Sequence, residues 1–572
     1  MRGGMFAALR LPLALLALAL TSAAQQPKRG KAAEDPDAEA RGADISAFKD
    51  WLKDYKSGAV RLVKEDKLDE AAMAELDLRM AKIAKWNRID VARTLFEAAS
   101  VDPKPSGASS STALVDYYRE LQPWRVQTLA CKHLRTLDGE GILPWLLGML
   151  SAPGIRGTTK NQDQQNAAAV LRVLGGHPKV EAQLELMRAC RAMPTELRVA
   201  AVNAMAKDPT IDLVPTLVEL LRDTEPNVRI AACNAIGTAL QPHVDETLGK
   251  TPDTATLAIR DNANSKLEEL LVRDTIWQVR SAAAYSLAIQ RCKAAIPAII
   301  RGLEAELARK KDPWAMDLRL HKLLEGLTGQ TVARGAIAPW QAFWAKEGPT
   351  FVVRPATKPG EEKPKADRYE KFFDLEVESD RVLFVVDFSG SMQEPITLRT
   401  GTTGAKAGQT MTKSALVVSE LKKLIMSLPD GALVNIVVFS DEVRIWRSEN
   451  NRPTLVKMND EARDDLLGTF LDSLRPAGPT NLHDALARAL DFGGRALHDK
   501  YYAAGFDTLY VISDGAPTAG ACTDKDEIRR RVRETNNLRK IAINCITFGE
   551  QNDVEFLGKM AAENGGRHIH VE

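Results

Sequence analysis

The chain has 572 residues, too many for one hydrophobic core, so we expect roughly three or four folding units. Its 77 Lys and Arg residues balance 76 Asp and Glu residues, and this balance excludes a global electrostatic field that favours nucleic acid or an anionic membrane. Any partner must therefore be recognised by a local site.

The N-terminus has the order of a secretory signal peptide. Arg2 and Arg10 precede an apolar run over residues 11–20, and small residues follow it. This run is too short to span a bilayer comfortably. We therefore predict a cleaved signal peptide over 1–24 and a secreted or periplasmic mature chain without a membrane span; an uncleaved anchor is the alternative. Residues 25–43 are small and charged, which predicts a flexible leader.

The next segment, 44–120, has apolar and aromatic residues at helical spacing. They are Phe48, Trp51, Leu52, Tyr55, Val60 and Leu62, followed by Leu76, Leu78, Met80, Ile83 and Trp86. This spacing predicts a helical segment, and its aromatic stripe is most simply the face that packs on the next domain.

A pattern of paired helices then repeats over 121–350. Second helices open with a hydrophobic residue followed by Arg, at Leu197-Arg198, Val228-Arg229 and Val279-Arg280. The turn and helix start at 224–229 and the Pro-opened helix at 295–300 resemble HEAT repeats. That resemblance implies an all-α solenoid, because one helix pair cannot bury its apolar face alone. The interval from Arg229 to Arg280 is longer than the interval from Arg198 to Arg229. An insertion near 241–261 accounts for the difference.

The helical array closes near Trp340 and Trp344. Their i, i+4 spacing puts both on one helix face, which favours plain packing over the alternative of sugar stacking. A linker is predicted over 351–371, because residues 354–368 are rich in Pro, Lys and Glu. We expect it to separate two mechanically independent parts.

Beyond this linker, continuous apolar runs predict the strands of a doubly wound α/β domain over 372–572. The run 382–386 ends in Asp387, Ser389 and Ser391, and the run 508–513 ends in Asp514. Open α/β sheets bind ligands at the carboxyl ends of their strands. We therefore expect these oxygen-bearing side chains to meet at one edge of the sheet.

Those residues strongly resemble the von Willebrand factor A family and its metal-ion-dependent adhesion site. The family motif is matched by Asp387, Ser389 and Ser391, by Thr480 in a GxTN-like turn, and by Asp514 in an SDG turn. The resemblance implies a single divalent cation at these five positions. Mg²⁺ is expected at such a hard oxygen site, with Mn²⁺ or Ca²⁺ as alternatives.

In the family, a Glu or Asp carboxylate of a partner protein takes the open coordination position. The polar loop 393–410, with Arg399 and Lys406, is either a selector of such an acidic partner or an ordinary surface loop. Glu394 stands where some family members place a ligand of a second metal. A metal-free site whose hydroxyls cap the turn is the structural alternative.

No catalytic site is predicted. Ser389 and Ser391 lack a nearby His, and the sequence contains no GxSxG, HExxH or GxxxxGK motif. His483 follows Thr480 closely, but the family starts a helix there. His568 and His570 share one face of a terminal strand, where solvent-facing or packed side chains are more common than metal ligands.

The six cysteines stand singly, at Cys131, Cys190, Cys233, Cys292, Cys522 and Cys545, without CxxC pairs. This excludes the usual zinc-ribbon spacings and a dense disulfide framework. Cys233 and Cys292 fit small buried thiols. The sequence leaves open whether two of the six cysteines form a disulfide bridge.

The sequence as a whole indicates an exported, bacterial-type binding or adhesion protein that is not an enzyme. Its metal site is expected to engage an acidic group of a protein partner, and its solenoid to present a second, concave interaction surface. Two alternatives remain: a non-catalytic subunit of a chelatase-like enzyme complex, and a structural envelope protein that uses the domain for packing.

Overall fold

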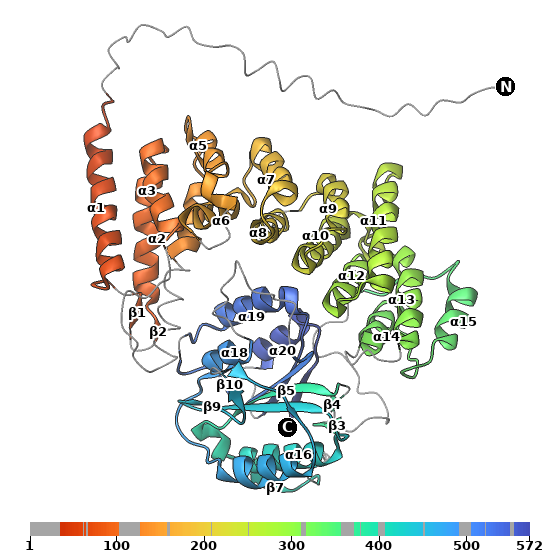
Figure 1. Ribbon diagram of the computed structural model, residues 1–572. Coiled ribbons are helices and arrows are strands. Elements are labelled where there is room, and N and C mark those ends of the chain that lie inside the picture. The colour runs from red at the N-terminus through yellow and green to blue at the C-terminus, as the bar shows by residue number, and fades with distance from the viewer. Residues whose placement is uncertain are drawn as a thin grey trace, which may run out of the picture.

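The computed structural model describes residues 35–571 except 61, 65–66, 102–125, 157–160, 208, 250, 310–315, 356–370, 374, 378, 399–405, 450–451, 491–504, 521 and 549–553. It contains a curved array of helices and, in the mouth of that curve, an α/β domain (Figure 1). The predicted signal peptide lies outside the described residues. Among the residues that are described, no helix is both long and apolar enough to cross a membrane.

The helical array consists of helices stacked in two layers. Residues 126–135 are helical, and the helices with defined bounds are α1 (Ala38–Ser57), α2 (Glu70–Ala84), α3 (Ile89–Ala99), α5 (Ile142–Met149), α6 (Gln162–Leu174), α7 (Val180–Ala192), α8 (Thr195–Met205), α9 (Val214–Leu220), α10 (Pro226–Val244), α11 (Thr254–Arg273), α12 (Trp277–Ile289), α13 (Ile296–Ala308), α14 (Met316–Thr328) and α15 (Ala338–Glu347). Helices α6, α8, α10, α12 and α14 contact in series, as do α5, α7, α9, α11 and α13. The predicted solenoid is confirmed.

The recurring Arg at the second-helix start holds neighbouring repeats together. Arg198 of α8 pairs with Asp223 in the following turn at 2.8 Å, and Arg229 of α10 pairs with Asp274 at 2.9 Å. Each carboxylate lies one repeat further along the chain. The hydrophobic-Arg pattern therefore marks a ladder of ion pairs between successive turns of the solenoid.

Two sequence predictions about the array need correction. Helix α1 begins at Ala38, inside the predicted leader, and its Phe48, Leu52 and Tyr55 belong to the same continuous core as the solenoid. In the described residues, the long interval between Arg229 and Arg280 holds no inserted domain, and a 3-10 helix at Glu246–Leu248 lies between α10 and α11. Instead, α10 and α11 are long helices of 19 and 20 residues, so the extra residues are absorbed as helical turns.

The closing helix and the cysteines behave as packed residues. Trp340 on α15 is buried and donates its indole N–H to Nδ1 of His321 at 3.0 Å, which confirms the packing role. Trp344 is partly buried against the same core. All six cysteines are buried free thiols.

The α/β domain is built on a twisted sheet of seven strands, in the order β12-β8-β5-β13-β14-β15 with β9 also paired to β8. The strands are β5 (Arg381–Asp387), β8 (Leu433–Phe439), β9 (Val443–Ile445), β12 (Val456–Lys457), β13 (Thr508–Ser513), β14 (Ala542–Phe548) and β15 (His568–Val571). Strands β8, β5, β13, β14 and β15 are parallel, while β9 and β12 run antiparallel to β8.

Helices cover both faces of this sheet, as continuous apolar strands require. They are α16 (Lys413–Ser427), α17 (Asp460–Asp464), α18 (Leu482–Leu490), α19 (Lys525–Arg539) and α20 (Val554–Glu563). Alternate residues of β5 point to opposite faces: Phe384 and Val386 join the core under α16, and Leu383 and Val385 join the core under α18, α19 and α20. The predicted fold class is confirmed.

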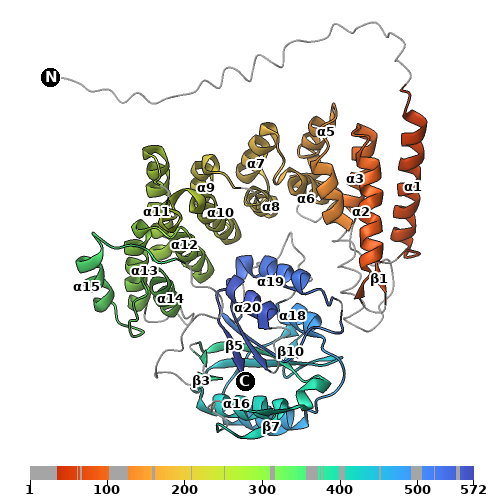
Figure 2. The same ribbon diagram turned by 180° about the vertical axis from the view of Figure 1, so that it is seen from behind.

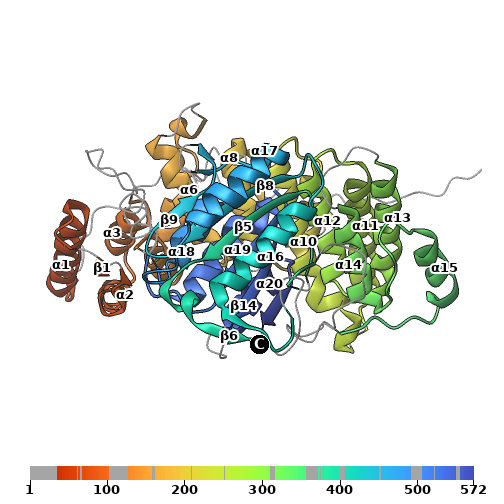
Figure 3. The same ribbon diagram turned by 90° about the horizontal axis from the view of Figure 1, so that it is seen from below.

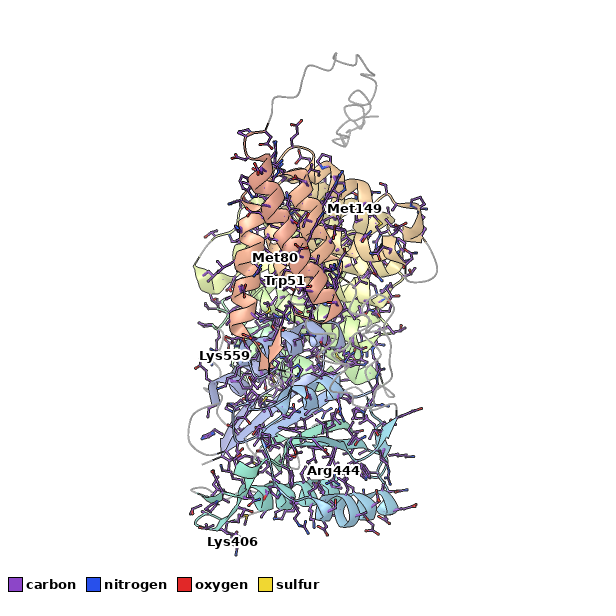
Figure 4. All side chains as sticks on the ribbon, turned by 90° about the vertical axis from the view of Figure 1, so that its left-hand side faces the viewer. Trp51, Met80, Met149, Lys406, Arg444 and Lys559 are labelled. Atoms are coloured by element: carbon purple, nitrogen blue, oxygen red, sulfur yellow. The ribbon has the colours of Figure 1, made fainter. Side chains whose placement is uncertain are left out.

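The described residues also contain short 3-10 helices, one π-helical stretch at Asp465–Phe470 and four short antiparallel strand pairs: β1 (Val63–Lys64) with β2 (Lys67–Leu68), β3 (Lys371–Phe372) with β4 (Leu375–Glu376), β6 (Pro395–Thr397) with β7 (Thr410–Thr412), and β10 (Ser448–Glu449) with β11 (Arg452–Pro453). The β6–β7 hairpin forms the ends of the polar loop 393–410. Arg399 lies outside the described residues. Lys406 is exposed, at the end of the molecule opposite the N-terminal helices that carry Trp51 and Met80 (Figure 4).

The two parts share an interface, which the prediction of two mechanically independent parts did not include. Figure 2 shows α19 facing the inner layer of the solenoid, and α19 contacts α10. Arg319 of α14 donates to the carbonyl oxygens of Asp507 at 2.8 Å and Lys540 at 2.5 Å, and Lys540 Nζ donates to Asn234 at 2.7 Å. The composition of a linker describes the linker alone, so it did not reveal this interface.

The domain occupies only the middle of the curve. Seen from the side of α16, the helical array extends past the domain at both ends, with α1 at one and α15 at the other (Figure 3). Of the contacting residues, Asp507 directly precedes β13 and Lys540 lies two residues before β14, so both are at the amino ends of these strands. The carboxyl ends, where ligands are expected, are at the opposite edge of the sheet.

Candidate metal centre

Asp387 is the last residue of β5, and its side chain is fully buried. Its Oδ2 accepts a hydrogen bond from Ser513 Oγ at 2.6 Å, and its Oδ1 accepts one from the backbone N–H of Ser389 at 2.8 Å. Burial raises the pKa of Asp387 to about 6, with a further increase from the nearby charge of Asp514. Cation binding would relieve the unfavourable burial of this carboxylate.

The DxSxS loop connects Asp387 to the second carboxylate through a chain of hydroxyls. The Ser389 and Ser391 hydroxyls share a hydrogen bond of 3.1 Å, and Ser391 Oγ donates to Asp514 Oδ1 at 2.8 Å. Asp514 follows β13, which pairs with β5 in parallel register. The neighbouring strands thus bring together residues more than one hundred positions apart in sequence.

Thr480 is buried on the adjacent loop, which backbone hydrogen bonds hold against the DxSxS loop. The N–H of Gly390 donates to the Gly478 carbonyl at 2.8 Å. The N–H of Thr480 donates to Thr518 Oγ1 at 2.9 Å. Gly478 has φ +75°, and a Cβ there would lie 3.2 Å from the Asp441 carboxyl carbon, so glycine is required.

The structure therefore collects the five predicted residues at the carboxyl edge of the sheet in two ways. Hydrogen bonds join the side chains of Asp387 and Asp514 to Ser513 and Ser391, and Ser391 to Ser389. Thr480 is positioned through its loop backbone. The predicted donors are all oxygens, which is the ligand set that Mg²⁺, Mn²⁺ and Ca²⁺ prefer, so the residues present fit a hard divalent cation.

Lys413 is a site residue that the sequence did not reveal. It opens α16, its side chain is 8% exposed, and its Nζ lies 2.8 Å from Asp514 Oδ2 and 2.7 Å from Glu394 Oε2. Burial lowers the pKa of Lys413, but the two carboxylates raise it more, and the net pKa is raised. A lysine at a helix start has no motif around it, so only the tertiary contact identifies it.

The other residues considered from the sequence have different partners. Glu394, the possible ligand of a second metal, pairs with Lys413. His483 is buried, with Nδ1 2.8 Å from Asp484 Oδ1. His568 Nε2 and His570 Nδ1 both contact the Thr547 hydroxyl at 2.9 Å. Across the part of the chain that the structure describes, no cluster of three or more His, Cys, Asp and Glu is arranged to hold a metal.

Comparison with known proteins agrees with both parts of the fold. Residues 184–288 match the family of HEAT repeats, and residues 403–569 match the von Willebrand factor type A domain. Human inter-alpha-trypsin inhibitor heavy chain H4 is 31% identical over 194 residues, covering 33% of this chain and 18% of that protein. Human inter-alpha-trypsin inhibitor heavy chain H2 is 27% identical over 246 residues, covering 41% of this chain and 23% of that protein.

The chain thus matches less than a quarter of the length of these relatives. Among solved structures, the von Willebrand factor type A protein from Catenulispora acidiphila is similar at 19% identity, with a TM-score of 0.25, over 33% of this chain and 38% of that one. Together with the strand order and the helical layers, the family matches show that the chain carries a von Willebrand factor A domain preceded by HEAT repeats.

Proposed function

We propose that this chain is a non-enzymatic binding protein whose von Willebrand factor A domain captures a protein partner through a divalent cation. Asp387, Ser389, Ser391, Thr480 and Asp514 would hold the ion, most simply Mg²⁺. The observation that carries the proposal is the hydrogen-bonded cluster of oxygens at the carboxyl edge of the sheet. A cation held there supplies an open coordination position for a Glu or Asp side chain of the partner.

The domain's own residues prepare this site in three ways. The buried Asp387 is fixed by Ser513 and by the Ser389 N–H, so its orientation is set before an ion arrives. Ser391 is only partly buried, and its hydroxyl links the loop to Asp514. The Gly390 to Gly478 contact fixes the loop that carries Thr480. The similarity to inter-alpha-trypsin inhibitor heavy chains supports a role in protein binding.

The solenoid has a narrower role in this proposal than the sequence suggested. Part of its inner layer contacts α19 of the same chain, so a second partner surface must lie elsewhere on the solenoid. The solenoid then sets the direction of the carboxyl edge of the sheet. This edge carries the proposed metal site and faces away from the contact made by Asp507 and Lys540. A chelatase-like subunit and an envelope protein that uses the domain for packing remain as alternatives, and metal-dependent capture separates binding from packing.

Export is also proposed, on the basis of the apolar N-terminal segment that follows Arg2 and Arg10. N-terminal sequencing of the mature protein from an exporting host tests it. A start near residue 25 supports a cleaved signal peptide, and recovery of chains that begin at Met1 in the cytoplasm contradicts it.

Calorimetry of Mn²⁺ binding to the chelator-stripped full chain tests the metal site. We expect one bound ion, no binding by Asp387→Ala, and at least about tenfold weaker binding by Thr480→Val, which removes a hydroxyl at nearly constant volume. Thr350→Val changes an exposed threonine at the end of the solenoid and serves as the matched control. Unchanged Mn²⁺ affinity in Asp387→Ala would refute the assignment.

Partner capture tests the second half of the proposal. The wild-type chain should retain a protein from the envelope or secreted fraction in Mg²⁺ and lose it on addition of chelator. Thr480→Val should retain less, with little further loss on chelation. Full retention that is insensitive to chelator would place the partner surface on the HEAT repeats.

A further inference from the structure

One of the polar contacts of Asp514 is with a positively charged side chain of the protein, that of Lys413. Asp514 Oδ1 accepts from Ser391 at 2.8 Å, and Oδ2 accepts from the ammonium of Lys413 at the same distance. The Asp514 side chain is completely shielded from solvent, and Lys413 is nearly so. Screening by water is therefore weak, and the ion pair engages one of the two carboxylate oxygens that Asp514 could offer to a cation.

Lys413 has a second partner available beside the first. Glu394, whose side chain is 64% exposed, lies 2.7 Å from the same ammonium through Oε2. The backbone also ties these residues together, because the N–H of Lys413 donates to the Glu394 carbonyl at 3.1 Å. Lys413 can therefore release Asp514 and keep an ion pair, without moving its helix.

From this geometry we infer that Lys413 is a specificity-determining residue that competes with the divalent cation for Asp514, and that Glu394 holds the ammonium when the cation binds. The inference rests on the proposed metal site and deepens it. Asp387 and Asp514 together carry two negative charges, and Lys413 cancels one of them. The resident ammonium thus lowers the affinity of the site, so that it fills only when the free cation concentration is high or when a partner carboxylate adds its own charge.

Charge removal at position 413 provides the direct test, with calorimetry of Mn²⁺ binding to the full chain as the readout. Lys413→Gln keeps a hydrogen-bond donor and removes the charge. It should bind Mn²⁺ at least about tenfold more tightly than wild type, because a unit positive charge next to a ligand carboxylate opposes a divalent ion. Lys413→Arg keeps the charge and should stay within about threefold of wild type.

Lys422→Gln is the matched control. Lys422 lies on the same helix and pairs with Asp472 at 2.7 Å, on an exposed part of the surface. Its loss changes the net charge of the protein equally, so it should leave Mn²⁺ affinity within about twofold of wild type.

Glu394→Gln tests the second part of the inference and does not depend on the folding of Lys413→Gln. Without its alternative partner, Lys413 should hold Asp514 more firmly, and Mn²⁺ affinity should fall about three- to tenfold. In the Lys413→Gln background the same change should have less than about a twofold effect, because Glu394 acts through Lys413.

The outcomes separate this inference from the proposed function. Tighter binding by Lys413→Gln but not by Lys422→Gln supports competition. If wild type binds one Mn²⁺ and Lys413→Gln binds equally or more weakly, the competition is refuted while the metal site stands. If neither protein binds Mn²⁺, both the competition and the metal site are refuted.

Discussion

The buried carboxylate of Asp387 joins the chemistry of the site to the stability of the domain. Its side chain is inaccessible to solvent at the end of β5, and two hydrogen bonds orient it. Burial nevertheless favours the protonated form, since its pKa is raised to about 6. A charged Asp387 without a cation is therefore a source of strain in the metal-free fold, and neutralisation by a proton or a metal removes it.

This strain predicts a pH-dependent difference between wild type and Asp387→Asn in chelator. The folded-state pKa of about 6 lies above the ordinary 3.8, so the stability that the proton contributes is fully present below about pH 4 and is lost as pH rises through 6. The unfolding free energy of Asp387→Asn relative to wild type should increase by about 3 kcal/mol between pH 4 and pH 7.

Chemical denaturation of both proteins across this pH range measures the effect. Saturating Mg²⁺ at pH 7 should raise the stability of wild type and leave Asp387→Asn unchanged, which serves as the internal control. A stability difference that is constant with pH would show that Asp387 is charged without penalty in the folded domain.

At the scale of elements, the guanidinium of Arg319 makes hydrogen bonds between α14 and the sheet domain. Arg319 is 7% exposed, lies 4.9 Å over the ring of Trp277, and donates to the carbonyls that precede β13 and β14. These carbonyls are at the amino ends of the strands, and the Asp507 carbonyl also accepts from the N–H of Ala542 in β14 at 2.8 Å. Helix α19 adds Asn537, which accepts from Asn234 of α10 at 3.0 Å.

Arg319→Gln should loosen this contact, because glutamine cannot reach both carbonyls. Two charge-assisted hydrogen bonds are lost, which should weaken the docking of the domain on the solenoid by about 2–5 kcal/mol. Hydrogen exchange should accelerate around residues 507–509 and 538–542 and stay unchanged in α6. Arg301→Gln removes an exposed arginine that pairs with Glu268 and is the control. Equal exchange in all three proteins would contradict a holding role for Arg319.

At the scale of the whole molecule, the interface sets how the two parts behave when the chain between them is cut. A specific protease site placed within 356–370 should yield two fragments that still elute together, because Arg319, Asn234 and Lys540 hold them. The same cut in Arg319→Gln should give fragments that elute separately. Separation of the wild-type fragments at low protein concentration would show that the interface depends on the covalent connection.

The clustering of the five candidate metal ligands was predictable from sequence because their signals are local. Asp387 ends one buried strand and is followed at once by Ser389 and Ser391, Asp514 comes directly after another, and parallel strands place their carboxyl ends at one edge. Thr480 was recognisable from the GxTN-like turn. The hydrophobic-Arg pattern predicted the solenoid for the same reason, since it recurs at the start of the second helix in successive repeats.

Only the tertiary structure decided which charges balance the site and how the parts are joined. Lys413 and Asp514 are separated by 101 residues, Ser513 and Asp387 by 126, and Arg319 and Asp507 by 188. A lysine or arginine on a polar helix face looks the same in sequence whether it meets solvent or a buried carboxylate. Its partner is chosen by the packing of whole elements, which no local pattern contains.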